Sequence, residues 1–364
     1  MEVGHFINLI SEKIAPFSLA ESWDNVGLQM GNTQSKVKGV VTCLDVTKSS
    51  LKYALTKNAN LILSHHPLFF HPLKKMDSQH PKYFLLKTIF DHDLTVASFH
   101  TNLDKAYPTL SDNYAQKLGL KNVAPIRPEK DYYFKFVIFV PHSHAEKVRS
   151  AIFTAGGGGV GNYSQCSYNI DGIGTFCPLE GSNPYLGSRG RREEVCEIRM
   201  EFRIPKQLLS CIVEAAKNAH PYEEMAYDVY PLKSFSEKEG LGRFGELSKK
   251  VSVKAFLNHV KKIWELKQIR GAFGLPTVKK VGICTGSGSS LIQEALSQGI
   301  DTFITGDLKY HDVQGAIEGH YNLIELDHFT SEKEYANFLA QVLKKIIDVP
   351  VFSFTEKKSP WRVV

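Results

Sequence analysis

The sequence predicts an α/β protein in which a core of mixed and mainly parallel sheets is covered by helices. Short apolar runs alternate with segments of helical periodicity up to residue 128, and the same alternation returns after residue 237. Between these parts the order becomes strand–helix–strand followed by strand–helix–strand, which is typical of a ferredoxin-like α+β unit. We therefore expect a discontinuous core, residues 1–128 and 237–364, interrupted by an insert at residues 129–236.

The first part of the core begins with a predicted amphipathic helix over residues 3–14, in which Phe6 and Ile10 recur at helical spacing. A turn-rich loop that packs under Trp23 is expected over residues 21–31. The elements that follow are predicted strands at residues 40–44, 61–64 and 94–98, with helices at residues 49–56 and 83–91. Such strand–helix–strand alternation favours a parallel sheet.

The insert is expected to contain strands at residues 132–140, 194–204 and 226–230, with helices at residues 144–154 and 206–220. The glycine run at residues 155–161 lacks the trailing lysine of a phosphate-binding loop, so it is predicted to be a turn region. Residues 237–246 contain spaced glycines and are expected to be the linker that returns to the core.

The second part of the core is predicted to contain a helix at residues 253–264 and strands at residues 281–284, 302–305 and 322–326. A long helix to Ile347 should follow them. Ser331 and Glu334 could form a capping box at its start, and Thr330 is an alternative cap.

The composition is that of an ordinary globular protein, with 364 residues, 43% hydrophobic and 23% charged. The net charge of +6 is mild, so nucleic acid binding is not indicated, although the charge does not rule it out. Six scattered cysteines without a C-x-x-C pair favour reduced thiols in a cytoplasm. We expect a cytoplasmic protein without a membrane segment, because no apolar run reaches the length of a bilayer span.

Histidines and carboxylates gather at the ends of three predicted elements. His65 and His66 follow one strand, Asp104 lies just past another, and His328 and Glu332 are four residues apart at a helix start. Because strand ends are where sites form in open α/β sheets, these side chains are candidate metal ligands. Imidazoles and carboxylates without a thiolate suit zinc, manganese, iron or cobalt.

Each of these residues also has a purely structural interpretation. The two adjacent histidines could simply cap a strand, and they can meet one ion or ion pair only if the chain turns at the strand tip. Asp104 could be a helix N-cap. His328 and Glu332 could be ordinary first-turn residues of a helix, where the dipole favours a glutamate.

A glycine-rich turn, Thr285–Ser290, joins a predicted strand to a helix. Free N–H groups at such a turn can bind an anion, so Gly286, Ser287 and Gly288 form a candidate anion site. The turn could equally be a structural helix start. Arg243 and Lys309, together with the net positive charge, would favour anionic substrates over neutral ones.

The motifs at these positions resemble those of the GTP cyclohydrolase I type 2 homologue family, also called the Nif-three-like dinuclear-metal family. The resemblance is carried by five motifs that span nearly the whole chain: residues 21–27 (ESWDNVG), 64–67 (SHHP), 100–104 (HTNLD), 306–311 (GDLKYH) and 327–332 (DHFTSE). The insert resembles the PII/CutA-like domain of the longer bacterial members, on the stretches 220–223 (HPYE) and 161–164 (GNYS).

The resemblance implies two divalent metal ions per chain, held by His65, His66, Asp104, His328 and Glu332. Zinc is the first expectation. The resemblance also implies a toroidal homohexamer with the metal sites facing its inside.

Two classes of function follow. The first is a metal-dependent hydrolase that acts on a nucleotide or another phosphorylated small molecule, with His100 and Asp307 as candidates for proton handling. The second is a non-catalytic metal-binding or regulatory protein whose insert is a sensing or assembly module. The family name records a cyclohydrolase attribution, which does not settle the reaction of any one member.

Overall fold

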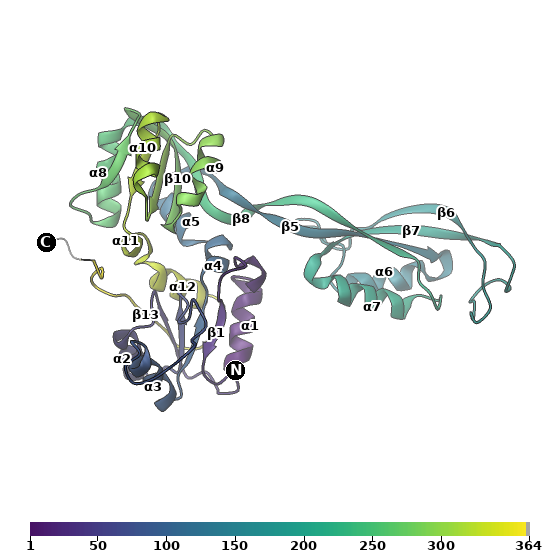
Figure 1. Ribbon diagram of the computed structural model, residues 1–364. Helices are drawn as coiled ribbons and strands as arrows, with labels where there is room; N and C mark the ends of the chain where they lie inside the picture. Colours follow the sequence, from purple (N-terminus) through teal and green to yellow (C-terminus); the bar gives the residue numbers. More distant parts are fainter. Residues whose placement is uncertain (362–364) are drawn as a thin grey trace. The chain divides into compact units, whose positions relative to one another are not determined.

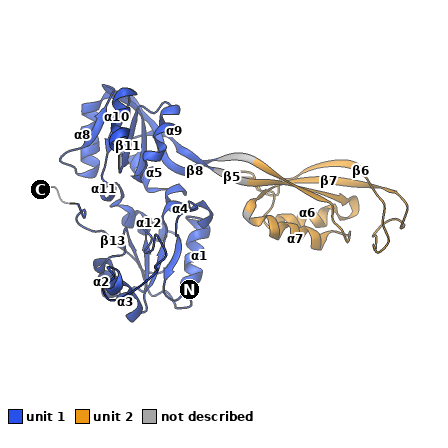
Figure 2. Cartoon of the chain, viewed as in Figure 1, with its two compact units in different colours: residues 1–129, 236–364 blue, residues 130–235 orange. Residues whose placement is uncertain are grey.

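The computed structural model describes residues 1–361, except for the side chains of residues 130–132, 207 and 233–235. The chain divides into two compact units (Figure 2). Unit 1 comprises residues 1–129 and 236–364, and unit 2 comprises residues 130–235. Residues 362–364, which the predicted core includes, lie outside the described residues.

The first sheet of unit 1 has the strand order β1-β4-β3-β2-β13 (Figure 1). Strands β13, β2, β3 and β4 are parallel, and β1 is antiparallel to β4. Helices cover both faces, so β2, β3 and β4 are buried along their whole length. The strands are β1 (Gly27–Met30), β2 (Val40–Cys43), β3 (Leu61–Ser64), β4 (Thr95–Ser98) and β13 (Val351–Phe354), and the helices are α1 (Val3–Lys13), α2 (Lys48–Thr56), α3 (Tyr83–Asp91) and α12 (Tyr335–Leu343).

The second sheet of unit 1 has the order β8-β10-β11-β12-β9. Its central strands β10, β11 and β12 are parallel, and the outer strands β8 and β9 are antiparallel to their neighbours. The strands are β8 (Tyr227–Ser252), β9 (Arg270–Phe273), β10 (Thr277–Ser287), β11 (Thr302–Gly306) and β12 (Asn322–Glu325), and the helices are α5 (Leu110–Lys117), α8 (Val253–Trp264), α9 (Ile292–Ser297) and α10 (Tyr310–Glu318).

One hydrophobic cluster joins the two sheets of unit 1. It contains Phe6 of α1 and Leu63 of β3 together with Trp264 of α8 and Ile283 of β10. The buried Trp264 ring lies 4.5 Å from the ring of Tyr114, measured between centroids. Because the apolar faces of both sheets share one core, unit 1 is a single folding unit around two sheets.

Unit 2 has the topology β5-α6-β6-β7-α7-β8, with the sheet order β6-β7-β5-β8. This is the ferredoxin-like α+β arrangement that the sequence predicts, so the fold class of core and insert is confirmed. Helices α6 and α7 pack on the sheet through a separate cluster that includes Ile138, Met200 and Ile212. The elements are β5 (Lys121–Pro141), α6 (Ala145–Thr154), β6 (Tyr168–Phe176), β7 (Glu193–Pro205) and α7 (Leu209–Ala219), followed by the start of β8.

Residues 237–246 are part of β8, so the prediction of a linker there is wrong. Their glycines allow β8 to approach a neighbouring strand of the same chain closely. A Cβ atom on Gly240, whose φ is +147°, would lie 2.3 Å from the carbonyl oxygen of Arg127. Spaced glycines in a strand mark such approaches as well as loops, and the sequence pattern does not distinguish them.

The long helix predicted to end near Ile347 is interrupted. A short helix, α11 (His328–Glu332), precedes α12, and its N-cap is Asp327, whose side chain accepts a hydrogen bond from the N–H of Thr330. Neither predicted cap is used, because Ser331 Oγ donates instead to the carbonyl of His328. The structure also contains β1, β6, β9 and β13, which the sequence analysis does not identify.

Arg243 is buried, with 1% of its surface exposed. Its guanidinium donates to Asp112 Oδ1 at 2.7 Å and to the carbonyl oxygens of Gly240 and Ala106. Arg243 therefore attaches β8 to α5 inside the core, and the expectation that it attracts anionic substrates is wrong. Within the described part of the chain, no helix combines the length and apolar character that crossing a bilayer requires.

Because each unit has its own hydrophobic core, unit 1 is expected to fold without unit 2. Replacing residues 130–235 with a short flexible linker should leave unit 1 folded, because each buried cluster of unit 1 consists of its own residues. Circular dichroism and thermal unfolding of the shortened chain test this, with elemental analysis for bound metal. A chain that is unfolded, or folded without its metal, would show that unit 1 depends on unit 2.

Candidate metal centre

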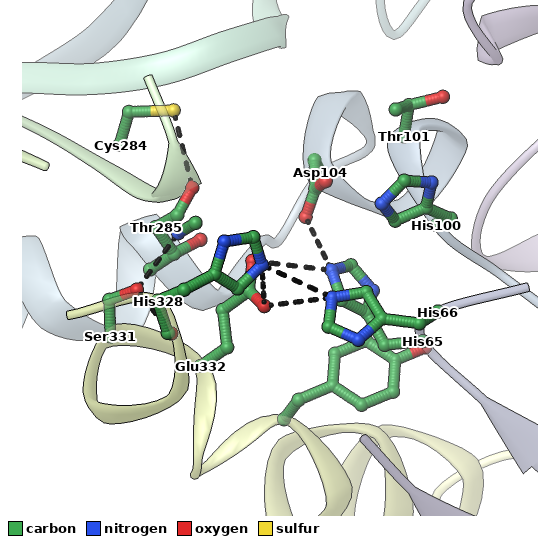
Figure 3. A network of polar contacts seen from close by, with 12 residues as sticks. His65, His66, His100, Thr101, Asp104, Cys284, Thr285, His328, Ser331 and Glu332 are labelled. Atoms are coloured by element: carbon green, nitrogen blue, oxygen red, sulfur yellow. Dashed lines mark hydrogen bonds and ion pairs between the residues drawn. The ribbon is translucent and has the colours of Figure 1, made fainter. Parts of the chain in front are cut away.

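The carboxyl ends of both sheets of unit 1 carry the predicted ligands. Parallel strands β3 and β4 end at the same edge, and they lead into His65 and His66 and into α4 (Thr101–Lys105), which contains Asp104. Strand β12 leads into α11, which contains His328 and Glu332. The structure brings all five side chains into one polar cluster, with His100 beside it (Figure 3).

The chain turns immediately after β3. The N–H groups of His65 and His66 both donate to the carbonyl of Leu44, at 3.2 and 3.0 Å. Ser64 Oγ donates to the carbonyl of His66 at 2.8 Å. This turn places the two imidazole rings side by side, with their centroids 5.1 Å apart, and so meets the condition for both histidines to face one site.

The ring nitrogen Nδ1 of each of the three histidines has its own acceptor. His66 Nδ1 lies 2.8 Å from Asp45 Oδ1, and His328 Nδ1 lies 2.7 Å from Asp307 Oδ2. His65 Nδ1 lies 3.1 Å from the carbonyl oxygen of Phe99. In metal sites such partners fix the tautomer, because a proton on Nδ1 leaves the lone pair of Nε2 for the metal.

Glu332 lies at the centre of the cluster and is 3% exposed. Its Oε1 is 3.5 Å from His65 Nε2, and its Oε2 is 3.2 Å from His66 Nε2 and 3.0 Å from His328 Nε2. Asp104 Oδ1 approaches His65 Nε2 at 3.6 Å. The carboxylate thus presents Oε1 to His65 and Oε2 to His66 and His328, as a bridging ligand does.

The cluster fits a metal ion. The Nε2 atoms of His66 and His328 are 3.3 Å apart, so both can offer a lone pair at once only if a cation lies between or beside them. Glu332 Oε2 is buried and accepts no hydrogen bond of normal geometry from any described residue. Ligand atoms converge in two overlapping groups, His65–His66–His100 and His66–His328–Glu332. The nitrogen and oxygen donors suit borderline divalent metals.

The pKa values of the two carboxylates in the cluster are shifted in opposite directions. Burial opposes the charge of Glu332, but the imidazoles of His65 and His328 hold its pKa well below the usual value. Burial raises the pKa of Asp104, although His65 and His100 oppose this effect. The surroundings therefore favour the charged form of Glu332 more than that of Asp104.

His100 is held by a carboxylate of its own. Its Nδ1 lies 2.9 Å from Asp24 Oδ1, and the other oxygen of Asp24 accepts hydrogen bonds from the N–H and the hydroxyl of Thr101. Burial opposes the charge of Asp24, but the hydrogen bonds from His100 and Thr101 lower its pKa to about 2. The His100 ring is thus oriented against His65, at 5.0 Å between centroids.

Asp307, the second predicted proton-handling residue, lies behind His328 on the side away from Glu332. It has a left-handed backbone conformation with φ of +53°, which is uncommon for residues other than glycine and is found at functional sites. Its position is that of a carboxylate that orients a histidine ligand.

The glycine turn lies beside the cluster. A Cβ atom on Gly286 would be 2.2 Å from Glu332 Oε1, so only glycine leaves room for this carboxylate. Two N–H groups of the turn are already engaged, because Gly286 donates to Ser331 Oγ and Gly288 donates to Thr305 Oγ1. Helix α9, which follows, has only six residues. The backbone of the turn thus stabilises α11 and β11, while the side chain of Ser287 faces a pocket.

Comparison with known proteins agrees with this geometry. The sequence profile of the family Duf34/NIF3 (NGG1p interacting factor 3) matches residues 1–360. The chain belongs to this family. The resemblance indicated by the motifs is thereby confirmed.

Members of the NIF3 family match this chain along almost its whole length. A Halalkalibacterium halodurans protein named GTP cyclohydrolase 1 type 2 homolog is 36% identical over 346 residues, covering 94% of this chain and 93% of that protein. A Bacillus subtilis protein of the same name is 34% identical over 331 residues, covering 90% and 89%. The crystal structure of a Bacillus cereus protein related to NIF3 superposes with a TM-score of 0.83 at 35% identity, covering 99% of each chain.

A pocket of about 520 Å³ opens above the ligand cluster of this NIF3-family protein. His66, His328 and Glu332 line one side of it. Two exposed aromatic residues, Trp23 and Phe70, line another, with 63% and 45% of their surfaces accessible. The pocket is large enough for a small-molecule ligand.

Sequence reasoning missed several residues of the site. Asp24 lies inside a quoted motif, and Asp45 follows strand β2, so the rule that selected His65 could have selected Asp45. No sequence pattern pointed to Tyr335. Its ring lies 4.2 Å from that of His65, and its hydroxyl donates to the carbonyl of Phe99, the acceptor of His65 Nδ1.

The ligand cluster predicts the behaviour of two double variants. Protein purified without chelator should contain a divalent transition metal, and the His65→Ala, His328→Ala variant should lose it, because each group of donors then lacks a nitrogen. Elemental analysis measures the loss. The matched control is His142→Ala, His144→Ala in unit 2, which removes two histidines outside both groups. Equal metal in all three proteins would contradict the assignment.

Metal loading of the metal-free protein should release protons. Burial opposes the charge of His66, but Asp45 and Glu332 raise its pKa to about 10, and Glu332 raises that of His328 to about 9. Both rings are therefore protonated at pH 7.5 without metal, and metal affinity should rise with pH toward these values.

Titration calorimetry of metal binding in buffers of different ionisation enthalpy measures this release. The Asp45→Asn variant should release fewer protons at pH 8, because His66 loses the acceptor that raises its pKa. Heats that do not depend on the buffer would show that the rings are already neutral.

Proposed function

We propose that this protein is a dinuclear metal-dependent hydrolase that acts on a nucleotide or a related phosphorylated small molecule. The supporting observation is Glu332, which lines an open pocket and whose Oε1 faces His65 while its Oε2 faces His66 and His328. Two divalent ions, with zinc as the first candidate, would be held by His65, His66, Asp104, His328 and Glu332. When bound there, they would lower the pKa of water and polarise the substrate.

The proposed role of His100 is to hold and move a proton. Its Nδ1 is fixed by Asp24, so its other nitrogen is oriented by the protein and not by solvent. His100 also lines the pocket, within reach of a substrate placed over the ligands. An imidazole held by a buried carboxylate is a common general base or acid. Asp307, by contrast, would position His328.

The pocket walls support a substrate with a flat ring and polar substituents. Trp23 and Phe70 both contact the His100 ring edge-on, at 6.1 and 5.6 Å between centroids, and both remain exposed for a ligand. Ser287 and Ser290 also line the pocket. Base stacking with polar contacts is how proteins hold nucleotides without a phosphate-binding loop.

The names of the relatives agree with a nucleotide substrate, since the two curated proteins are called homologs of a GTP cyclohydrolase. That name supplies a candidate, GTP, for the first assay. The proposal also includes the toroidal homohexamer that the family resemblance implies.

A second candidate function is a non-catalytic metal-binding or regulatory protein. The observation that favours it is unit 2, a complete ferredoxin-like unit with a cavity of its own. In that case the metal cluster would stabilise unit 1, and unit 2 would sense a ligand.

The hydrolase proposal predicts metal-dependent turnover of GTP, another nucleotide or a phosphoester, with about two ions per chain. Glu332→Gln should reduce turnover by more than the roughly 10- to 100-fold typical of residues that only orient a ligand, because an amide cannot bridge two cations as an anion does. Steady-state assays with zinc, manganese, iron and cobalt measure the effect.

Glu318→Gln is the matched control, since Glu318 is exposed on α10 and its charge change is the same. Unchanged turnover in Glu332→Gln would contradict the proposed site. Absence of turnover with every one of these metals would favour the regulatory function.

A further inference from the structure

Unit 2 contains a cavity that the proposed hydrolase does not use. Its volume is about 410 Å³, which lies within the range of roughly 300–1,000 Å³ for small-molecule sites. It is formed by the end of β6, the loop after β6, Glu197 on β7 and the segment 222–226. The predicted family motif at residues 220–223 therefore contributes directly to its wall.

The wall formed by the loop over residues 177–192 is held in place by hydrogen bonds. The N–H of Gly190 donates to the carbonyl of Pro178 at 2.8 Å, which closes the loop on itself. The N–H of Asn183 donates to Glu223 Oε1 at 2.8 Å, which joins the loop to the turn after α7. The cavity is thus pre-formed, and a ligand need not order the loop.

Aromatic rings form a large part of the lining. Phe176 and Tyr185 both lie against Tyr222, at 6.4 and 6.0 Å between ring centroids and at interplanar angles of 44° and 43°. Rings tilted in this way are not stacked flat against one another. The faces of aromatic rings carry negative potential and attract cations, above all organic ammonium ions.

The charged residues of the lining are all acidic. Glu197, Glu223 and Glu224 line the cavity, and no lysine, arginine or histidine is among its described lining residues. His220 packs against Tyr222, its Nδ1 accepts a hydrogen bond from the N–H of Tyr222 at 3.1 Å, and burial lowers its pKa, so its surroundings disfavour a positive charge. An anionic ligand would be repelled.

A bare metal ion does not suit these carboxylates. The groups of described side chains that converge closely enough to hold an ion are both in unit 1. The glutamates of the cavity are instead spread over β7 and the segment after α7. A cation with an apolar body fits the spacing, because it can contact the rings and a carboxylate together.

The polar groups of Tyr222 and Glu197 lie close to each other in the cavity, where burial raises the pKa of Tyr222 and the Glu197 carboxylate raises it further. Tyr222 Oη is buried and forms no hydrogen bond of normal geometry with any described residue. Glu197 forms no ion pair with a described basic side chain, and its Oε2 lies over Gly174, where a Cβ would come within 2.3 Å. A carboxylate without a basic partner beside aromatic rings favours a cationic ligand.

We propose that the cavity of unit 2 binds a small organic ammonium ion, with Phe176, Tyr185 and Tyr222 around its apolar part and Glu197 beside its charge. This site lies outside the metal centre, and it does not depend on the proposed hydrolase activity. It gives unit 2 a ligand of defined chemistry.

Calorimetry of the full chain tests the proposal with choline and with its neutral isostere 3,3-dimethylbutan-1-ol. Choline should bind with a Kd of roughly 1 mM or lower, and the neutral isostere at least about tenfold more weakly. Glu197→Gln should weaken choline binding by about tenfold, while the matched control Glu214→Gln, an exposed glutamate on α7, should not.

A second pair of variants tests whether the aromatic ring of Tyr185 contributes to binding, independently of folding. Tyr185 is 50% exposed, so Tyr185→Leu should fold normally and lose choline affinity, whereas Tyr185→Phe should keep it. Equal binding of the neutral isostere would overturn the proposal, as would choline affinity that survives both Glu197→Gln and Tyr185→Leu. It would also be overturned if choline, tetramethylammonium and butylammonium all failed to bind, or if magnesium or zinc displaced them.

Discussion

The structure of unit 1 depends on one buried carboxylate. Glu332 is almost fully enclosed, and a buried anion costs several kcal/mol unless cations or hydrogen-bond donors surround it. Its neighbours His65 and His66 come from the edge of one sheet, while Glu332 itself follows the last parallel strand of the other. The two sheet edges must therefore face each other for the charge to be compensated, and the shared hydrophobic core behind them holds them there.

A second set of contacts determines how the imidazoles present themselves. The ring of each candidate histidine ligand is fixed at Nδ1 by a separate group, a carboxylate for His66 and His328 and a carbonyl for His65. The orientation of the donors is thus built into the polypeptide before any ion arrives. The left-handed conformation of Asp307 shows that the backbone accepts strain to keep one of these groups in position.

The sequence predicts the fold class and identifies the five candidate ligands. The carboxyl ends of parallel strands lie at one edge of a sheet regardless of how the loops are built, so residues that follow these strands can be expected to lie close together. The sequence does not predict the orienting role of Asp24, since the partner His100 is distant in the chain and leaves no local spacing, whereas Asp45 follows a strand end and could have been selected by the rule that selected His65. The short edge strands β1, β9 and β13 are not predicted, because a strand of four residues shows little periodicity. The glycines of β8 mislead because they serve a close approach to a neighbouring strand, and the same residues also make linkers.

The position of β13 has a consequence for the order of events during synthesis. This last strand, Val351–Phe354, pairs with β2 from the start of the chain, and Glu332 comes only shortly before it. A nascent chain on the ribosome has made His65, His66 and Asp104 long before it can complete either the first sheet or the ligand set. The first sheet of unit 1 and the set of candidate ligands are therefore complete only after Glu332 and β13 have been made, whereas unit 2, whose residues are all made earlier, is free to fold first.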